Sequence, residues 1–156
     1  MKLELWSIGK TFFSFVKEGE QEFEKRINKY LPFTNQVIEV KAKTKAPDVV
    51  KNLEGEKILS LLKPTDFLWL LDEKGKSFSS RKFATQLQTK FNDSGYKRIV
   101  FLVGGAYGFS EEVYQRANGK LSLSEMTYSH QLIRLIFLEQ LYRAFTILNN
   151  EPYHND

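Results

Sequence analysis

The chain has 156 residues, of which 42% are apolar and 14% aromatic, enough to bury the core of one domain. It contains no cysteine, and its only histidines are His130 and His154, so the sequence predicts no disulfide, no structural zinc and no other metal site. No run reaches the roughly 18 uncharged apolar residues of a membrane span, and Glu4 follows Met1-Lys2 too soon for a secretory leader. We therefore expect a soluble, cytoplasmic protein with a single domain over residues 1–156.

The formal net charge is +4, and it is unevenly distributed along the chain. Residues 1–100 hold 19 Lys and Arg against 13 Asp and Glu, whereas residues 101–156 hold 4 against 6. Candidate contributors to a basic surface are Lys41, Lys43, Lys45, Lys74, Lys76, Arg81, Lys82, Lys97 and Arg98. Two interpretations stay open, namely ordinary solvated side chains or a surface that contacts a polyanion such as RNA.

The first part of the chain alternates between strand-like and helical apolar periodicity. Lys2–Ile8 is predicted to be a strand, followed by a helix from about Phe12 to Tyr30. A second strand, Val37–Val40, precedes a helix from Pro47 to about Leu62, whose first residue is a proline that suits an initial turn. These segments form two strand-helix units.

The same alternation continues in the middle of the chain. Phe67–Leu71 is a continuous apolar run, which is typical of a strand covered on both faces. We expect Asp72–Lys76 to be a polar loop, followed by a helix over Ser79–Phe91 and a buried strand over Ile99–Val103. This part adds two more strands to the sheet.

The last part begins with the glycine-rich loop of residues 104–108. Ser110 is predicted to cap a short helix, Leu121–Leu123 to form the last strand, and Ser129–Leu148 the final helix. Repeated strand-helix units of this length predict an α/β fold with a mostly parallel sheet and helices on both faces.

Apolar residues surround nearly the whole circumference of the predicted last helix. They are Leu132, Ile133, Leu135, Ile136, Phe137, Leu138, Leu141, Tyr142, Phe145, Ile147 and Leu148. A helix packed on one side of a sheet needs only one apolar face. The helix is therefore either central to the fold or in contact with a second subunit, and we expect a homodimer.

The loops after three strands are candidate binding segments, because ligands of open α/β sheets lie beyond the carboxyl ends of the strands. Gly104-Gly105 allows a ligand to approach the backbone closely, although a simple tight turn would use the same residues. Its spacing is not that of a dinucleotide fingerprint. Glu111 and Glu112 open the next helix and would repel a phosphate, which disfavours ATP or NAD and suits a ligand with a cationic centre.

The segment from Leu121 to His130 offers the hydroxyls of Ser122, Ser124 and Thr127, together with free backbone groups that could recognise an adenine edge. The alternative is an ordinary loop in which Ser129 caps the following helix. On spacing alone, the capping interpretation is favoured.

Polar residues near the end of the chain are a second candidate group. Arg143 stands four residues after Glu139, so it is either a paired structural arginine or a fixed fork for a phosphate or carbonyl. Tyr153-His154 lies in a tail that is short enough to fray, but its composition is not that of a flexible linker.

The loops and the tail together resemble the RlmH family, which belongs to the knotted SPOUT class of RNA methyltransferases. The matching segments are residues 101–109 (FLVGGAYGF), 121–127 (LSLSEMT), 130–134 (HQLIR), 139–144 (EQLYRA) and 152–154 (PYH). Two departures are visible: Ser129 stands where the family often has proline, and Asn155-Asp156 stands where a basic residue is frequent. The second departure puts a cationic role of the extreme tail in doubt.

The resemblance implies a C-terminal trefoil knot whose loops hold S-adenosyl-L-methionine in a bent shape. The positions that match the family's cofactor contacts are Leu71, Gly105, Ser124, Glu125, Met126, Thr127, Tyr128 and Ser129. It further implies a homodimer in which each active site receives its tail from the other subunit.

The implied reaction is transfer of the sulfonium methyl group to N3 of a pseudouridine in 23S ribosomal RNA at the subunit interface. Arg143 is then the candidate for stabilising the anionic base, His154 a weaker candidate for accepting its proton, and Tyr153 a residue that could stack on it. The chain has little room for a separate RNA-binding domain, so we expect assembled 70S ribosomes to be the substrate. Two alternatives stay open, a SPOUT enzyme acting on transfer RNA and a non-catalytic ribosome-binding module.

Overall fold

Five parallel strands form one sheet in a computed structural model that describes residues 1–156. The strands are β1 (Lys2–Ile8), β2 (Phe33–Ile38), β3 (Asp66–Ser77), β4 (Arg98–Val103) and β5 (Gly119–Ser122). Their order across the sheet is β2-β1-β4-β3-β5, and every neighbouring pair is parallel. The predicted α/β architecture is confirmed, while the trefoil knot stays a prediction from the resemblance.

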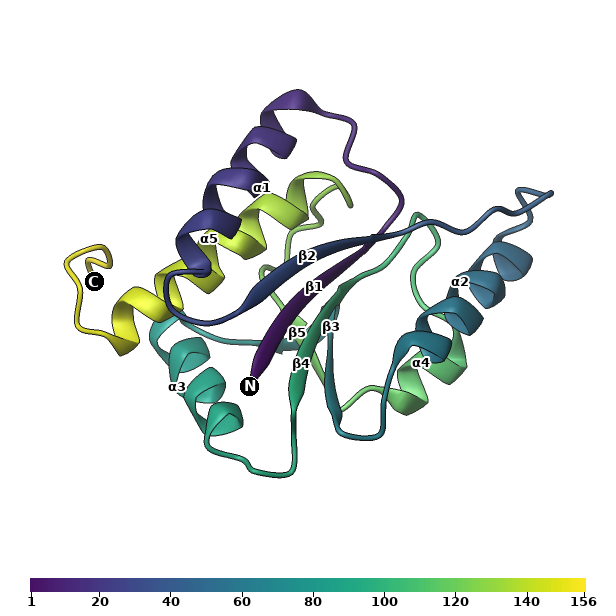
Figure 1. The fold of residues 1–156 in the computed structure, drawn as a ribbon. Coiled ribbons are helices and arrows are strands. Elements are labelled where there is room, and N and C mark those ends of the chain that lie inside the picture. Colours follow the sequence, from purple (N-terminus) through teal and green to yellow (C-terminus); the bar gives the residue numbers. More distant parts are fainter.

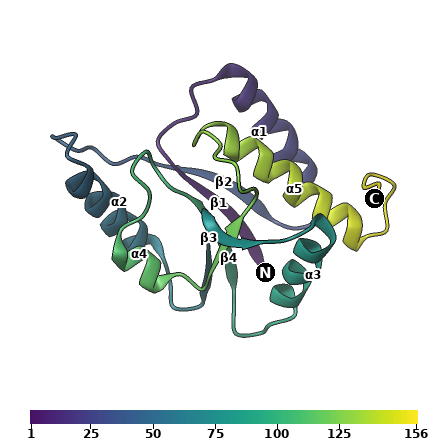
Figure 2. The same cartoon turned by 180° about the vertical axis from the view of Figure 1, so that it is seen from behind.

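Helices cover both faces of this sheet (Figures 1 and 2). They are α1 (Ser14–Ile27), α2 (Pro47–Leu61), α3 (Ser80–Phe91), α4 (Glu111–Arg116) and α5 (Leu132–Leu148). Figure 1 shows α1, α3 and α5 on one face and α2 and α4 on the other. None of these helices is both long and apolar enough to span a bilayer.

The central strand β4 shows why the sheet is buried on both sides. Ile99, Phe101 and Val103 point into the apolar core beneath α1, α3 and α5. Val100 and Leu102 point into the second core, beneath α2 and α4. Successive side chains of a strand alternate between its faces, so a strand with two covered faces has a continuous apolar sequence.

Helix α5 lies between α1 and α3, which explains much of its apolar circumference (Figure 1). Phe137, Leu138 and Leu141 are fully buried against the sheet. On its flank, a Cβ atom added to Gly19 of α1 would come within 2.5 Å of Leu135 Cδ1. A glycine at position 19 therefore allows the two helices to approach closely.

Arg134, in the first turn of α5, is fully buried and ties this helix to the end of β1. Its Nη1 donates to the carbonyl of Gly9 at 2.8 Å, its Nη2 to that of Ile8 at 2.9 Å and its Nε to that of His130 at 2.9 Å. A buried guanidinium is stable only when its donors are satisfied, and these carbonyls satisfy them.

Two predicted strand boundaries were wrong. Strand β2 covers Phe33–Ile38 and not Val37–Val40, because it pairs with β1 from Phe33 onward and buries only its first and last residues. Asp72–Lys76 is not a loop but part of β3, which continues to Ser77. The register against β5 shifts between Leu71 and Lys76, so the polar residues bulge out of the sheet before pairing resumes.

Two predicted helices were too long. Helix α1 ends at Ile27, because the Asn28 side chain accepts a hydrogen bond from the Phe33 backbone N–H at 3.0 Å and turns the chain into β2. Helix α5 begins at Leu132 and not at Ser129. The Ser129 hydroxyl instead accepts from the Leu132 N–H at 3.1 Å, so it caps the turn that leads into the helix.

Arg98 is not part of a basic surface, contrary to its place among the predicted contributors. Its guanidinium bridges two buried carboxylates, with Nη2 at 2.5 Å from Asp66 Oδ2 and Nη1 at 3.2 Å from Glu4 Oε2. Burial alone would raise the pKa of both acids, but Arg98 and the other hydrogen bonds to them bring each pKa below its ordinary value. Arg98 therefore joins the starts of β1, β3 and β4.

Candidate functional site

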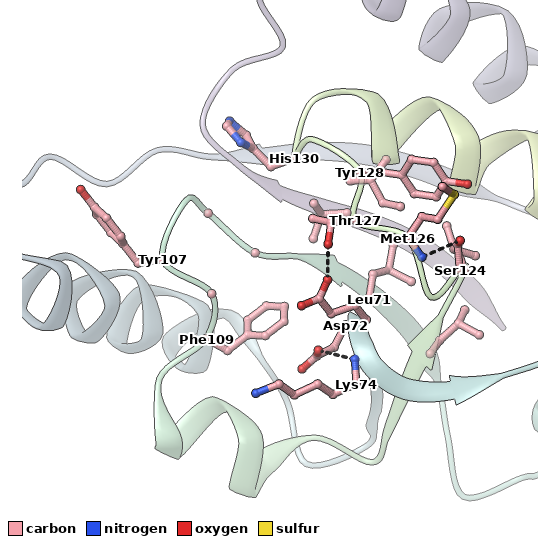
Figure 3. A pocket seen from close by; sticks show the side chains of 18 of the residues that line it. Leu71, Asp72, Lys74, Tyr107, Phe109, Ser124, Met126, Thr127, Tyr128 and His130 are labelled. Atoms are coloured by element: carbon pink, nitrogen blue, oxygen red, sulfur yellow. Dashed lines mark hydrogen bonds between the residues drawn. The ribbon is translucent and has the colours of Figure 1, made fainter.

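A cavity of about 440 Å³ lies at the carboxyl ends of β4 and β5 and beside the bulge of β3, at the edge of the sheet where ligands of open α/β folds gather (Figure 3). The bulge of β3, the ends of β4 and β5 with the loops that follow them, and single residues of α4 and α5 line it: Leu71, Asp72, Glu73, Lys74, Val103, Gly104, Gly105, Tyr107, Gly108, Phe109, Tyr114, Leu121, Leu123, Ser124, Met126, Thr127, Tyr128, His130 and Ile133. Its volume is that of a typical small-molecule site.

The loop after β4 forms one wall and uses glycine where neighbouring groups come close. A Cβ atom on Gly104 would lie 3.1 Å from the Phe109 ring, and one on Gly105 would lie 2.7 Å from Glu54 Oε2. Gly108 has a φ of 80°, a left-handed conformation that glycine adopts without strain. The glycines thus serve both the turn and its packing against Phe109 and Glu54.

Two carboxylates of the β3 bulge, those of Asp72 and Glu73, stand on another wall. Tyr114 donates to Asp72 Oδ2 at 2.7 Å, and burial together with this bond raises the pKa of the tyrosine to about 12. Thr127 donates to Glu73 Oε2 at 2.7 Å and so links the bulge of β3 to the segment before α5 (Figure 3). With Lys74 as the one lysine or arginine of the lining, this wall suits a cationic group better than a phosphate.

The loop after β5 is held by its own hydroxyls. Ser122 donates to the Ser124 carbonyl at 2.9 Å, and the Ser124 hydroxyl accepts from the Met126 N–H at 2.9 Å (Figure 3). Met126 is 76% exposed at the cavity mouth, together with Tyr107 and Tyr128. A rigid loop with exposed apolar side chains at its rim is suited to being covered by a ligand or a partner.

The structure gathers most of the predicted cofactor contacts around this cavity. Leu71, Gly105, Ser124, Met126, Thr127 and Tyr128 all line it. Glu125 and Ser129 belong to the same loop but are not among the lining residues, and Ser129 caps the turn before α5. The predicted contacts are thus brought together by strand β3 and by the loops after β4 and β5.

The other predicted site residues meet at the far end of α5. Arg143 Nη2 lies 2.6 Å from Glu139 Oε1, which confirms the predicted pair, and Tyr153 donates to the same oxygen at 3.0 Å. The Arg143 guanidinium also lies over the Tyr153 ring, 4.8 Å from its centroid. We call Glu139, Arg143, Tyr153 and His154 the tail cluster.

His154 completes the tail cluster, and the partners of its two ring nitrogens indicate which nitrogen carries the proton. Its Nδ1 lies 3.2 Å from Arg143 Nη1, and its Nε2 lies 2.8 Å from Asp156 Oδ1. Since arginine only donates, Nδ1 accepts and Nε2 carries the proton. Asp156 also pairs with Arg81, and the two contacts lower its pKa to about 2.

The cavity and the tail cluster of one chain lie at opposite ends of α5. Helix α5 begins at Leu132, beside the cavity, and Arg143 follows 11 residues later, about 16 Å along the axis at 1.5 Å per residue. Figure 1 shows the C-terminus beyond the far end of this helix. A single chain therefore does not bring Arg143, Tyr153 and His154 to its own cavity.

Several lining residues were not predicted from the sequence. Asp72 and Glu73 could have been found, because they follow the last apolar residue of a buried strand. His130, whose pKa is lowered by burial and by Arg134, also lines the cavity. Glu54 does not line this cavity but lies against Gly105, and it carries no such signal, because only the tertiary fold brings α2 against the loop after β4.

Comparisons with known proteins agree with this geometry. Residues 1–154 match a family model described as "Predicted SPOUT methyltransferase". A ribosomal RNA large subunit methyltransferase H from Parabacteroides distasonis is 52% identical, with 100% of both chains covered, and one from Flavobacterium psychrophilum is 50% identical, with 99% of both chains covered. In fold alone, the chain is similar to a probable methylase family protein from Haemophilus influenzae, with a TM-score of 0.52, 12% identity, and 95% of this chain and 66% of that chain covered.

Proposed function

Because the chain belongs to the SPOUT methyltransferase family, we propose that it transfers a methyl group from S-adenosyl-L-methionine to large-subunit ribosomal RNA. In finer terms, we propose N3 of a pseudouridine in 23S RNA of the assembled 70S ribosome as the acceptor. The names of the full-length relatives support the RNA class, and the resemblance noted in the sequence supports the nucleotide.

The residues of the cavity fit this methyl donor. Asp72 and Glu73 supply negative charge for the sulfonium and ammonium groups of the donor. The donor has no phosphate, so its site does not need the N–H groups of a helix N-terminus. Leu71, Met126 and the loop after β4 offer apolar surface and backbone groups for an adenosine. The bound donor supplies an electrophilic methyl carbon, and the protein's part is to orient it and exclude water.

The tail cluster supplies what the acceptor needs. N3 of a pseudouridine carries a proton at neutral pH, so the nitrogen becomes nucleophilic only when that proton leaves. Arg143 is held by Glu139 and Tyr153 and can present its guanidinium to the carbonyl oxygens of the developing anion. Tyr153, whose pKa is raised by burial and by Glu139, stays a neutral ring on which a base can stack.

A homodimer would bring the two halves of the site together. Large apolar side chains are exposed near the start of α5, with Phe12 68% and Phe15 59% accessible, and Phe13 packs against both rings. The rings of Phe12 and His130 are edge to face with their centroids 6.5 Å apart, which places this patch beside the cavity mouth. A second copy that covered the patch could place its own tail cluster over this cavity.

The observation that carries the proposal is the cavity at the carboxyl ends of β4 and β5 and the bulge of β3, lined by six of the predicted cofactor contacts. The test incubates the protein and methyl-labelled donor with 70S ribosomes, isolated large subunits or bulk transfer RNA, and maps the labelled nucleoside. We expect N3-methylpseudouridine in 23S RNA from 70S ribosomes. Label in transfer RNA would show that the substrate is transfer RNA and not ribosomal RNA. Strong labelling of protein-free transcript would show that the assembled ribosome is not required. Failure to bind the donor would indicate a non-catalytic ribosome-binding protein.

A further inference from the structure

Three lysines lie on the connection between β2 and α2, which covers residues 39–46 and which we call the lysine strap. Lys41, Lys43 and Lys45 stand at every second position, and all three residues are exposed. None of them forms an ion pair with a carboxylate of the chain. Figure 1 shows this connection extending past the end of the sheet, on the side away from the C-terminus. The strap thus offers three free positive charges to a partner.

The lysine strap borders the mouth of the first cavity. Tyr107, which lines that cavity, donates from its hydroxyl group to the Lys45 carbonyl at 3.3 Å. Nearer β2, Lys41 lines a second cavity, of about 540 Å³, at the carboxyl ends of β1 and β2. His130 lines both cavities, so the strap runs along the rim beside the first one. An RNA strand whose acceptor base lies over the first cavity would therefore bring its backbone to this rim.

The arginines of the chain are already bound by internal partners. All six donate to carboxylates or backbone carbonyls of the chain itself: Arg26, Arg81, Arg98, Arg116, Arg134 and Arg143. The cations that remain free for a phosphate are therefore lysines. The ammonium group of a lysine is a compact point charge, which binds a phosphate without the fixed geometry of a guanidinium fork.

The carboxylates near the strap do not neutralise its charge. Glu39 and Asp48, which flank the three lysines in the sequence, each lie within ion-pair distance of a lysine outside the strap. Glu54 lines the second cavity together with Lys41, but only 6% of Glu54 is exposed, and its Oε2 atom is shielded from solvent without a hydrogen-bond partner. Burial raises the pKa of this carboxyl group, which favours its neutral form. The positive charge of the strap is therefore directed to solvent.

From this arrangement we propose that the lysine strap binds the phosphate backbone of the ribosomal RNA strand that carries the acceptor nucleotide. The inference rests on the proposed function and names the surface by which the chain holds its substrate. Tyr107, which is 42% exposed beside the strap, can stack on a base next to the bound phosphates. Phosphate contacts fix the position of a nucleic acid but do not read its sequence, so the strap leaves the choice of nucleotide to the composite site.

Phosphate binding by lysines can be recognised from its dependence on salt. Each contact releases counterions from the RNA, so log affinity falls against log salt with a slope of about 0.7 to 0.9 per contact. The strap variant, Lys41→Gln with Lys43→Gln and Lys45→Gln, should therefore lower the steepness of this dependence by about two to three. Replacing the same three lysines by arginine (Lys41→Arg, Lys43→Arg and Lys45→Arg) keeps the charge and should keep the wild-type slope.

The experiment measures the Kd for 70S ribosomes by filter binding over a series of KCl concentrations at constant Mg²⁺. It also measures kcat at saturating ribosomes and the affinity for S-adenosyl-L-methionine by calorimetry. For the strap variant we expect the Kd for ribosomes to rise about tenfold or more at 0.15 M KCl. The kcat and the donor affinity should stay within about twofold of the wild type, because the lysines contact neither the donor nor the reacting atoms.

The matched control combines Lys29→Gln, Lys63→Gln and Lys97→Gln. These lysines are exposed and form no ion pair, and they precede β2, β3 and β4 at the opposite end of the sheet. Both triple variants lower the net charge of +4 by three, so a difference between them reports the place of the charge and not its sum. The control should keep the wild-type slope within about half a unit.

The outcomes separate the two proposals. A wild-type protein that binds no donor or labels no ribosomal RNA sinks the proposed function itself. If the wild type is active and the strap variant matches the control in affinity and slope, the role of the strap is overturned. A loss of kcat or donor affinity without a loss of ribosome affinity would also overturn it, since the strap would then only support the cavity through Tyr107.

Protein-free 23S RNA distinguishes an RNA partner from a protein partner. The strap variant should also bind this RNA with a lower salt slope than the wild type, because the electrostatic part of RNA binding does not depend on sequence. A slope that changes on ribosomes but not on protein-free RNA would assign the strap to an acidic ribosomal protein and overturn the phosphate contact.

Discussion

The two ends of α5 present opposite kinds of chemistry. At its start, the cavity consists of turns, glycines and hydroxyls that hydrogen-bond one another, and the ligand would contact mainly backbone and apolar surface. At its end, the tail cluster consists of charged side chains, with Arg143 between Glu139 and His154. Tight binding needs a rigid shape, whereas catalysis needs a charge at the reacting atoms. In the proposed function, these two tasks are therefore separated along one helix.

The separation has a consequence for how variants behave. A change at the start of α5 should alter donor affinity, and a change at its end should alter the rate with bound donor. In a dimer that exchanges tails, the two kinds of damage fall on different chains.

Arg143→Ala should lower kcat by about 10²- to 10³-fold, because the developing anion loses a charged donor. Donor affinity should stay at the wild-type value, since Arg143 is not among the cavity residues. Single-turnover transfer and calorimetry measure the two quantities. Arg143→Lys keeps the charge but not the fork, so it should be intermediate; an unchanged kcat in Arg143→Ala would remove Arg143 from the site.

Mixed dimers of Arg143→Ala and Gly105→Val should recover activity that neither variant has alone. Valine at position 105 puts a Cβ within 2.7 Å of Glu54 Oε2, so it should displace the loop after β4 and distort the cavity that this loop lines. If each site combines one chain's cavity with the other's tail cluster, random mixing restores about a quarter of all sites. Refolding the two chains together and assaying transfer measures this. Activity that stays at the level of the separate variants would place both halves of a site on one chain.

Thr127→Val should weaken donor binding by about two- to fivefold and leave kcat unchanged, because it removes one partly exposed hydrogen bond to Glu73. Calorimetry with S-adenosyl-L-methionine measures the change. Thr89→Val, which removes an exposed intrahelical hydrogen bond on α3, is the matched control and should not alter affinity. Equal effects of the two substitutions would show that the Thr127–Glu73 link does not shape the cavity.

The smallest effect concerns stability and pH. The pKa of Glu54 is raised in the folded protein, so its ionised form destabilises the fold above that pKa, and the penalty vanishes below the ordinary value of 4.5. Glu54→Gln should therefore increase Tm more at pH 8 than at pH 4. Thermal unfolding at the two pH values checks this, and a difference in Tm that does not change with pH would contradict it.

The sequence was most informative where the fold is simplest. The apolar runs of Phe67–Leu71 and Ile99–Val103 predicted buried strands because both of their faces are covered. Strand β2 was misplaced because it lies at the edge of the sheet and only its first and last residues are buried, so its apolar pattern is weak. The second half of β3 was missed because its polar residues look like a loop and are held by long-range pairing with β5.

The site divides in the same way. Segments with dense local motifs, such as Gly104-Gly105 and Ser124 to Tyr128, were found from the sequence and line the cavity. Glu54 was not found, because its significance depends on a helix 50 residues earlier in the chain folding back against the loop at Gly105. Local patterns indicate turns and strands, but an unpartnered buried charge exists only once the chain has packed.

The hydrogen bonds from Arg134 to the end of β1 also bear on how the chain folds during synthesis. The carbonyls of Ile8 and Gly9 precede their partner by 126 and 125 positions, so they leave the ribosome long before Arg134 is translated. Strand β1 likewise waits for β4, about 95 residues later, before its second edge is paired. Contacts of such long range slow folding, and N-terminal segments emerge first. The carbonyl groups at the end of β1 are therefore hydrated in the nascent chain until Arg134 has been synthesised and α5 has packed.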